Sequence, residues 1–184
     1  MPPNSPTILY SARLALRRPA SQDIAALFSI YGDPATNTFN PAGPYQHVAE
    51  AEATMERWLR QWQQHGFGQW AVSLKEDEER IIGFGGLSHA LFGQQEKVNL
   101  GYRFATAAWG QGLATELSAT ALEFGFATLE LEEIWALVRE THQASRRVLE
   151  KVGLLQVDKV AEPLGGAGSV IYVLSRAAYQ PAAA

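Results

Sequence analysis

A pair of glycines, Gly110 and Gly112, brackets Gln111 just before a stretch with helical periodicity. Glycine reaches positive φ angles and has no Cβ, so a ligand can approach the main chain closely there. The first N–H groups of a helix have no acceptor inside the helix and lie at the positive end of its dipole. Together these features predict a backbone site for an anion, with no charged side chain required. A tight strand-to-helix turn that binds nothing would use the same glycines, and the residues alone leave that alternative open.

The glycine-bearing turn differs from two common phosphate-binding motifs. No Gly-Lys-Ser or Gly-Lys-Thr follows Gly112, as a Walker-type loop would require. The turn also lacks the Gly-x-Gly-x-x-Gly spacing with an acidic residue placed to hold a ribose. The sequence therefore argues against both of these nucleotide-binding classes.

Two segments resemble motifs of the GNAT superfamily of N-acetyltransferases. The first is Leu-Gly-Tyr-Arg-Phe-Ala-Thr-Ala-Ala-Trp-Gly-Gln-Gly-Leu-Ala-Thr-Glu at 100–116, which is similar to motif A. The second is Ser-Arg-Arg-Val-Leu-Glu-Lys-Val-Gly-Leu at 145–154. It is similar to the S-x-x-V-L-E-K-x-G-F segment of the branch that contains the ribosomal-protein N-terminal (alanine or serine) acetyltransferases. The two motifs stand at the family's separation, and the order of elements agrees with the family over residues 8–176.

The resemblance implies a V-shaped mixed sheet whose fourth strand splays from its fifth, with acetyl-CoA bound as cosubstrate in the opening. Pantetheine would lie along the fourth strand, the pyrophosphate at the glycine-bearing turn, and the thioester sulfur near the start of the last helix. Carried over by position, the cofactor-binding residues are expected to be Tyr102, Arg103, Phe104, Trp109, Gly110, Gln111, Gly112, Leu113, Ala114, Thr115, His142 and Ser145.

The sequence departs from the family pattern at three positions that matter for chemistry. Trp109 stands where the superfamily usually has Arg or Gln, and His142 stands where this branch has Asn. Leu149 occupies the place of the general-acid tyrosine found in many members. The resemblance then leaves Ser145 as the candidate general acid that protonates the leaving thiolate. His142 takes the hydrogen-bonding role of the family's Asn or caps the last helix.

No general base is evident from the sequence. The branch commonly carries a Glu three residues before its Gly-Tyr tyrosine, and this chain has Asn99 there. Glu96 points to the other face of the same strand by parity, and His89 follows the third strand; we keep both as base candidates. Glu116 lies in the first turn of the motif-A helix, where the helix dipole already accounts for a carboxylate.

The lack of an evident base bears on the acceptor amine. An α-amine with a pKa of about 7.9 is about one-quarter neutral at pH 7.4, whereas a lysine amine is neutral roughly once in a thousand. We therefore expect acetyl transfer to a primary amine, with a protein or peptide N-terminal α-amine favoured. A small-molecule amine (antibiotic, polyamine or amino acid) is the second reading. A non-catalytic CoA-binding sensor module is the third, supported by Leu149 and Asn99.

The composition is that of an ordinary globular protein. The chain has 184 residues, with 47% apolar and 18% charged residues, which predicts a single domain over 8–176 with flexible ends at 1–7 and 177–184. A net charge of −4 argues against nucleic-acid binding. The absence of cysteine excludes disulfides and Cys-based zinc sites, and we expect no metal. We expect no membrane span and no secretory signal, hence a cytoplasmic location. The sequence leaves open whether the protein forms a homodimer.

Apolar spacing predicts the elements that position these residues. A helix is expected after Ser21, which is placed to cap it, and a second from Val48 to a stop at Gly66. Further helices are expected at about 112–128 and 142–152. Strands are expected at 11–18, 70–74, 81–87, 98–104, 133–139, 154–161 and 169–175. The connections include a loop at 33–44, a hairpin turn at 77–79 and a turn at 162–166.

These elements predict an α+β fold, an α/β sandwich with a mixed sheet of about seven strands and helices on both faces. The strand–helix–strand unit in the middle favours a parallel pair, and the flanking hairpins are antiparallel. Four aromatic residues, Trp58, Trp62, Phe67 and Trp70, either line an acceptor pocket or form a core stripe, and a core stripe is the commoner meaning of this spacing.

Overall fold

A computed structural model of the chain describes residues 8–161 and 168–181. The strands are β1 (Ile8–Tyr10), β2 (Leu14–Arg17), β3 (Gln69–Leu74), β4 (Asp77–Phe92), β5 (Gln95–Phe104), β6 (Glu133–Arg139), β7 (Leu155–Val160) and β8 (Ser169–Ser175). The helices are α1 (Ile24–Gly32), α2 (Val48–His65), α3 (Leu113–Glu123) and α4 (Gln143–Lys151). A π-helical turn, Phe124–Thr128, extends α3.

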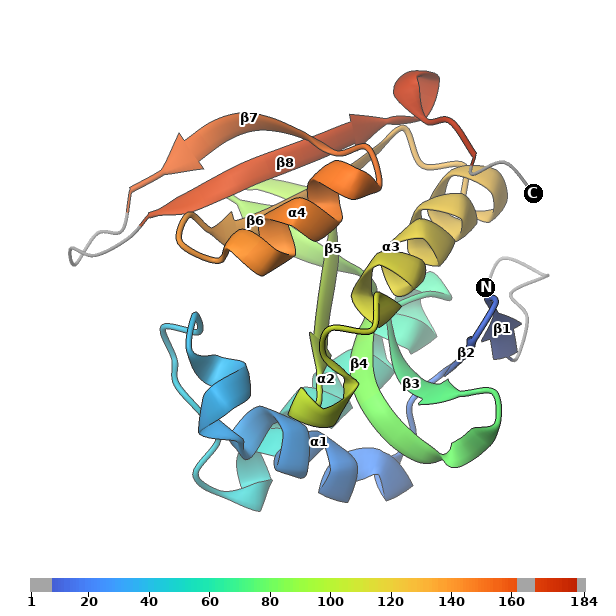
Figure 1. The fold of residues 1–184 in the computed structure, drawn as a ribbon, viewed down its shortest axis with the longest axis vertical. Coiled ribbons are helices and arrows are strands. Elements are labelled where there is room, and N and C mark those ends of the chain that lie inside the picture. Colours follow the sequence, from blue (N-terminus) through green and yellow to red (C-terminus); the bar gives the residue numbers. More distant parts are fainter. Residues whose placement is uncertain (1–7, 162–167, 182–184) are drawn as a thin grey trace.

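The strands form one sheet in the order β1-β2-β3-β4-β5-β6-β8-β7 (Figure 1). β5 and β6 are parallel, and the other neighbours are antiparallel. The predicted mixed sheet is therefore confirmed, with eight strands rather than seven. The additional strand is β1, and Ser11–Arg13, which were expected within the first strand, connect β1 to β2.

The alternation of side chains along β4 and β5 places two helices on each face of the sheet. Phe84 packs with residues of α1 and α2. Its neighbour Gly85 faces α3 so closely that a Cβ there would lie 2.5 Å from Cδ2 of Leu117. α4 lies on the same face as α3, because Tyr102 of β5, which is paired with Gly85, bonds to Ser145 of α4. This layering confirms helices on both faces (Figure 1).

The four aromatic residues of the α2–β3 region belong to the core. Trp58, Trp62, Phe67 and Trp70 are 8%, 7%, 7% and 3% exposed. Trp58 packs in the cluster under α1 and α2, and the other three join the larger cluster that spans the sheet. The core-stripe reading is therefore correct, and these rings do not line an open acceptor pocket.

Several local predictions are wrong for identifiable reasons. Ser21 does not cap a helix; Asp23 accepts the Ala20 N–H at 2.8 Å instead and pairs with Arg17. The β3–β4 turn is at residues 75–76, because Asp77 already pairs with Leu74 and begins β4. Within the expected loop 33–44, Pro34–Asn37 forms a short 3-10 helix.

The end expected to be flexible from residue 177 has defined structure as far as Tyr179. Arg176–Ala178 forms a 3-10 helix, and the Tyr179 ring lies 4.8 Å from that of Phe126. The expected turn at 162–166 and the remaining parts of the two ends, 1–7 and 182–184, lie outside the described residues.

Candidate active site

The parallel strands β5 and β6 separate soon after they meet. They are registered at Asn99 and Trp135, and no ladder pair joins the described residues beyond that point. In Figure 1, β7 and β8 cross the top of the molecule at a steep angle to β4 and β5. Main-chain groups of residues 100–104 on β5 therefore face an opening, where a ligand can take the place of a neighbouring strand.

The glycine-bearing turn closes one end of this opening. Gly110 and Gly112 have φ angles of +73° and +76°, in the left-handed region that glycine tolerates best. α3 begins at Leu113. Among the described residues, the backbone N–H groups of 110–115 have no hydrogen-bond acceptor. Six consecutive free donors at the positive end of a helix dipole form a site that suits a diphosphate.

Trp109 stabilises the junction between β5 and this turn. Its indole Nε1 donates to the Phe104 carbonyl at 3.0 Å, although 52% of the residue remains exposed. A side chain that bonds to the last residue of β5 fixes where the strand ends relative to the turn. Trp109 therefore acts on the turn through the backbone and carries no charge to it.

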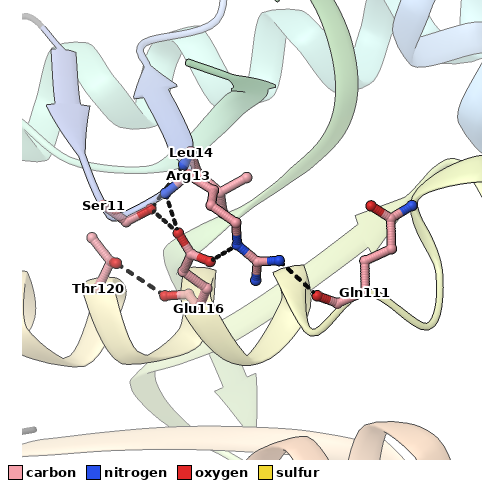
Figure 2. A network of polar contacts seen from close by, with 6 residues as sticks. All are labelled: Ser11, Arg13, Leu14, Gln111, Glu116 and Thr120. Atoms are coloured by element: carbon pink, nitrogen blue, oxygen red, sulfur yellow. Dashed lines mark hydrogen bonds and ion pairs between the residues drawn. The ribbon is translucent and has the colours of Figure 1, made fainter. Parts of the chain in front are cut away.

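A polar network holds the turn from the side of the β1–β2 connection (Figure 2). The Arg13 guanidinium donates from Nη1 to the Gln111 carbonyl at 2.9 Å and from Nε to Glu116 Oε2 at 2.7 Å. Glu116 Oε1 also accepts from Ser11 Oγ at 2.7 Å and from the Arg13 N–H at 2.6 Å. Burial would raise the pKa of Glu116, but these hydrogen bonds from Ser11 and Arg13 outweigh it and lower that pKa. Glu116 thus has specific partners in addition to the helix dipole.

Ser145 lies in the first turn of α4 and meets β5 across the opening. Its Oγ is 2.9 Å from the hydroxyl oxygen of Tyr102. Burial raises the pKa of Tyr102 to about 12, so its hydroxyl stays protonated at neutral pH. Leu149, where many relatives carry a tyrosine, is 2% exposed and belongs to the core. We call β1–β5 and β6–β8, which lie on either side of the opening, the two arms of the sheet. The hydroxyl pair Tyr102–Ser145 therefore joins one arm to the helix carried by the other.

His142 precedes α4 but makes no side-chain cap of that helix. Its ring stacks on Phe39, with centroids 4.0 Å apart and planes at 15°. Burial lowers the pKa of His142, and Nδ1 is buried without a partner among the described residues. Of the two roles considered for His142, a side-chain cap of the last helix is therefore wrong, and a hydrogen-bonding role toward a ligand stays a prediction. The stack instead joins the loop after α1 to the arm of the sheet that carries α4.

The Arg103 side chain points to the opposite face from Tyr102. Its Nη1 donates to Asn37 Oδ1 at 2.7 Å, and its guanidinium carbon lies 4.1 Å from the centroid of Tyr31. Burial raises the pKa of Tyr31 to about 12. Only the backbone of Arg103 is left to face the opening, while its charge lies on the side of α1.

His89 and Glu96 lie together at the far end of the β4–β5 hairpin. His89 lies within β4, not in a loop, and its Nδ1 is 3.5 Å from Glu96 Oε2. The His65 ring stacks on it at 4.2 Å. Burial, and then the charge of His65, lower the pKa of His89. His89 pairs with Val98, which is four residues and roughly 13 Å along β5 from Tyr102. The structure does not bring these two base candidates to Ser145.

The comparisons with known proteins now decide the family. The family described as "Acetyltransferase (GNAT) domain" matches residues 13–155. The chain belongs to the GNAT acetyltransferase family. As a GNAT enzyme it is an acyltransferase of the N-acetyltransferase class.

Two Bacillus subtilis proteins are similar to this GNAT enzyme. The uncharacterized N-acetyltransferase YoaA is 27% identical over 148 residues, covering 79% of this chain and 81% of that protein. The uncharacterized protein YkkB is 30% identical over 156 residues, covering 82% and 87%.

Solved GNAT structures share the fold. An acetyltransferase from Bacillus anthracis has a TM-score of 0.77 at 20% identity, covering 92% of this chain and 99% of that one. Spermidine N-acetyltransferase from Vibrio cholerae, in complex with CoA and spermine, has a TM-score of 0.74 at 18% identity, covering 90% of this chain and 97% of that one. Ribosomal-protein-S5-alanine acetyltransferase from Vibrio fischeri has a TM-score of 0.73 at 16% identity, covering 96% of this chain and 100% of that one.

Sequence reasoning missed the residues that support the GNAT site from a distance. Arg13 and Ser11 reach Glu116 from 103 and 105 positions away, so no local pattern indicated them. Phe39 and Asn37 lie in a segment that was expected to be a plain loop. One signal was available, because alternation along β5 puts Arg103 on the face opposite Tyr102.

No helix among the described residues is long and apolar enough to cross a membrane. Within the same residues, no cluster of three His, Cys, Asp or Glu side chains is placed to hold a metal ion.

Proposed function

We propose that this enzyme transfers the acetyl group of acetyl-CoA to the α-amine of a peptide or protein. The observation that carries the cosubstrate assignment is the run of unpartnered backbone N–H groups at 110–115, next to the open edge of β5. Pantetheine would lie along residues 102–104, and the diphosphate would accept from the turn and the start of α3. The site thus takes its ligand through main-chain groups.

Ser145 is the residue to which we assign the proton transfer. The amine nitrogen attacks the thioester carbonyl, the C–S bond breaks, and the thiolate takes a proton while the new amide nitrogen loses one. The Tyr102 hydroxyl stays protonated and can donate to Ser145 Oγ, which leaves the Ser145 proton free for the sulfur. A coenzyme A thiol has a pKa of about 8.5, so this donor supplies a modest part of the rate. A backbone N–H aimed at the carbonyl supports the oxyanion without a further side chain.

We place the acceptor on the α1 face of β5, opposite Tyr102, where the charge of Arg103 favours an α-amine over a polyamine. Arg103 lies beside Tyr31 and Asn37 on the face that carries α1. A polyamine would bring a second ammonium near this guanidinium, and like charges repel. Peptide carbonyls next to an α-amine can instead accept from the Arg103 N–H groups that Asn37 leaves unbonded. A substrate of the kind named for the Vibrio fischeri ribosomal-protein-S5-alanine acetyltransferase fits this arrangement.

The second candidate is acetylation of a small-molecule amine. It is favoured by the shared fold with the Vibrio cholerae spermidine N-acetyltransferase. A non-catalytic CoA-binding module is the third, since the position of the usual tyrosine is the core residue Leu149.

Release of free CoA from acetyl-CoA distinguishes these candidates. Because the chain has no cysteine, a thiol reagent reads the released CoA without background from the protein. We expect release with peptides that have a free N-terminus and not with N-blocked versions that contain lysine. Release with spermidine or free amino acids alone would establish the small-molecule reading. Tight CoA binding by calorimetry with no release for any amine would establish the sensor.

A further inference from the structure

Arg13 contacts the glycine-bearing turn and α3 from outside the run 110–115 that would bind the diphosphate. Its side chain is half exposed, yet it bonds to two separate points of the turn and of the first helical turn of α3 (Figure 2). An exposed ion pair alone contributes little to stability, because water screens it and two long side chains must be ordered. The geometry of the two bonds indicates what else Arg13 does.

The first bond sets the direction of a backbone donor. Arg13 Nη1 holds the carbonyl oxygen of Gln111 at 2.9 Å. In a planar trans peptide, the C=O of one residue and the N–H of the next point in opposite directions. The N–H of Gly112 is therefore turned away from Arg13. At this peptide Arg13 lies behind the turn, and the Gly112 N–H faces the other side.

The second bond controls a negative charge. Glu116 lies in the first turn of α3, where an unconstrained carboxylate could approach the same N–H groups that would bind a phosphate. Arg13 Nε and the Arg13 N–H hold both of its oxygens, and Ser11 adds a third bond. The carboxylate is therefore kept on the side of the β1–β2 connection, away from the free donors.

We infer that Arg13 is a positioning residue for the diphosphate of acetyl-CoA, acting through the Gln111 carbonyl and the Glu116 carboxylate. This role rests on the proposed cosubstrate site at 110–115. It assigns to the β1–β2 connection a part in cosubstrate recognition, although no atom of Arg13 needs to touch the ligand.

The test compares substrates with and without a diphosphate. Arg13→Ala is assayed with acetyl-CoA, with acetyl-dephospho-CoA and with S-acetylpantetheine, which contains no phosphate. We expect kcat/KM for the two diphosphate substrates to fall about tenfold, as loss of one oriented donor implies, and kcat/KM for S-acetylpantetheine to stay unchanged. Arg13→Lys should fall in the same direction, because one ammonium cannot replace the two-point contact of a guanidinium.

Arg60→Ala is the matched control. Arg60 is an exposed arginine on α2 in an ion pair with Glu56, 3.0 Å long, and we expect its removal to change none of the three substrates. If Arg13→Ala fails to fold, Arg13→Lys carries the same comparison. An equal loss on all three substrates, or no loss on any, would overturn the positioning role. A wild-type enzyme that uses S-acetylpantetheine as well as acetyl-CoA would instead overturn the diphosphate site itself.

Discussion

At the scale of single residues, one hydrogen bond joins the two arms of the sheet at the place where the thioester is expected. Ser145 Oγ and the Tyr102 hydroxyl lie 2.9 Å apart, and each comes from a different side of the opening. A serine in the first turn of a helix can also serve only a local structural purpose. The two roles of Ser145 differ in what its removal changes.

Replacing Ser145 by Ala tests whether this hydroxyl donates to the leaving thiolate. We expect kcat to fall roughly tenfold to a hundredfold, with little change in acetyl-CoA affinity, because a donor that acts in the transition state leaves ground-state binding alone. Tyr102→Phe removes only the partner hydroxyl and should give a smaller loss of kcat. Both kcat and the melting temperature are measured on each variant. A normal kcat with a lowered melting temperature would show that Ser145 is structural.

His142 predicts a dependence of stability on pH. Burial lowers its folded pKa below the reference value of 6.5, so the unfolded chain takes up a proton at higher pH than the folded protein does. The stability contribution of neutral His142 is therefore complete above about pH 6.5 and is lost as pH falls through the folded pKa. We expect the melting temperature to drop between pH 7.5 and 5.5, and His142→Asn to reduce that drop. His89, whose pKa is also lowered, should account for the part that remains. An unchanged pH profile in His142→Asn would show that the ring is not protonated on unfolding in this range.

At the scale of elements, the turn between β5 and α3 is a backbone site, so its glycines should tolerate little. In Gly112→Asp we expect CoA affinity to fall roughly tenfold or more. The added Cβ lies 3.7 Å from Arg13 Nη2, so the new carboxylate competes with the Gln111 carbonyl for Arg13 and adds negative charge to the turn. Asp adopts positive φ more readily than most residues, so the fold should survive.

Gly93 provides the matched control for the turn. It has a φ of +63°, and no described residue lies within 4 Å of an added Cβ. Gly93→Asp therefore pays a similar backbone cost, about 1 kcal/mol, without approaching the turn. Calorimetry should show normal CoA affinity in Gly93→Asp. Normal affinity in a folded Gly112→Asp would place the diphosphate elsewhere.

Elements with strong local patterns could be predicted closely from the sequence. β6 and β8 begin and end where alternation predicted, and α2 ends at Gly66, which adopts the left-handed conformation. β1 could not be predicted, because three residues do not establish a period and the strand exists only by pairing with β2. The cap at Asp23 could not be predicted either. Its carboxylate accepts from the Ala20 N–H and from the Arg17 side chain, and Arg17 belongs to the preceding strand.

At the scale of the whole molecule, acetyl-CoA should stabilise the fold. A ligand that binds only the native state at about a hundred times its Kd adds about 2.7 kcal/mol. For a chain of this length, that corresponds to a rise in melting temperature of roughly 5 to 10 °C. Thermal unfolding with and without millimolar acetyl-CoA measures the shift, and pantetheine is the comparison that lacks phosphate. A two-state transition that does not move with acetyl-CoA would contradict the cosubstrate site.

In the candidate site, too, features made by adjacent residues could be predicted from the sequence, and contacts between distant segments could not. The turn at 110–112 could be predicted from adjacent residues, because glycine conformations and helix amides are properties of a few positions. The Tyr102–Ser145 contact and the Phe39–His142 stack could not be, since each joins segments that meet only in the folded sheet. Motif resemblance supplied Ser145 but not its partner.

The bonds from Arg13 also bear on the order in which the protein folds. They join residues 98 and 103 positions apart, so they form only after most of the chain has been brought into place. α3 and its glycine turn can form earlier, from local interactions. The Gly112 N–H takes its fixed direction only when the β1–β2 hairpin docks on α3. We therefore expect tight binding of the diphosphate to be a late event in folding, so that CoA capture during refolding would mark the docking of the β1–β2 hairpin on α3 rather than formation of the helix.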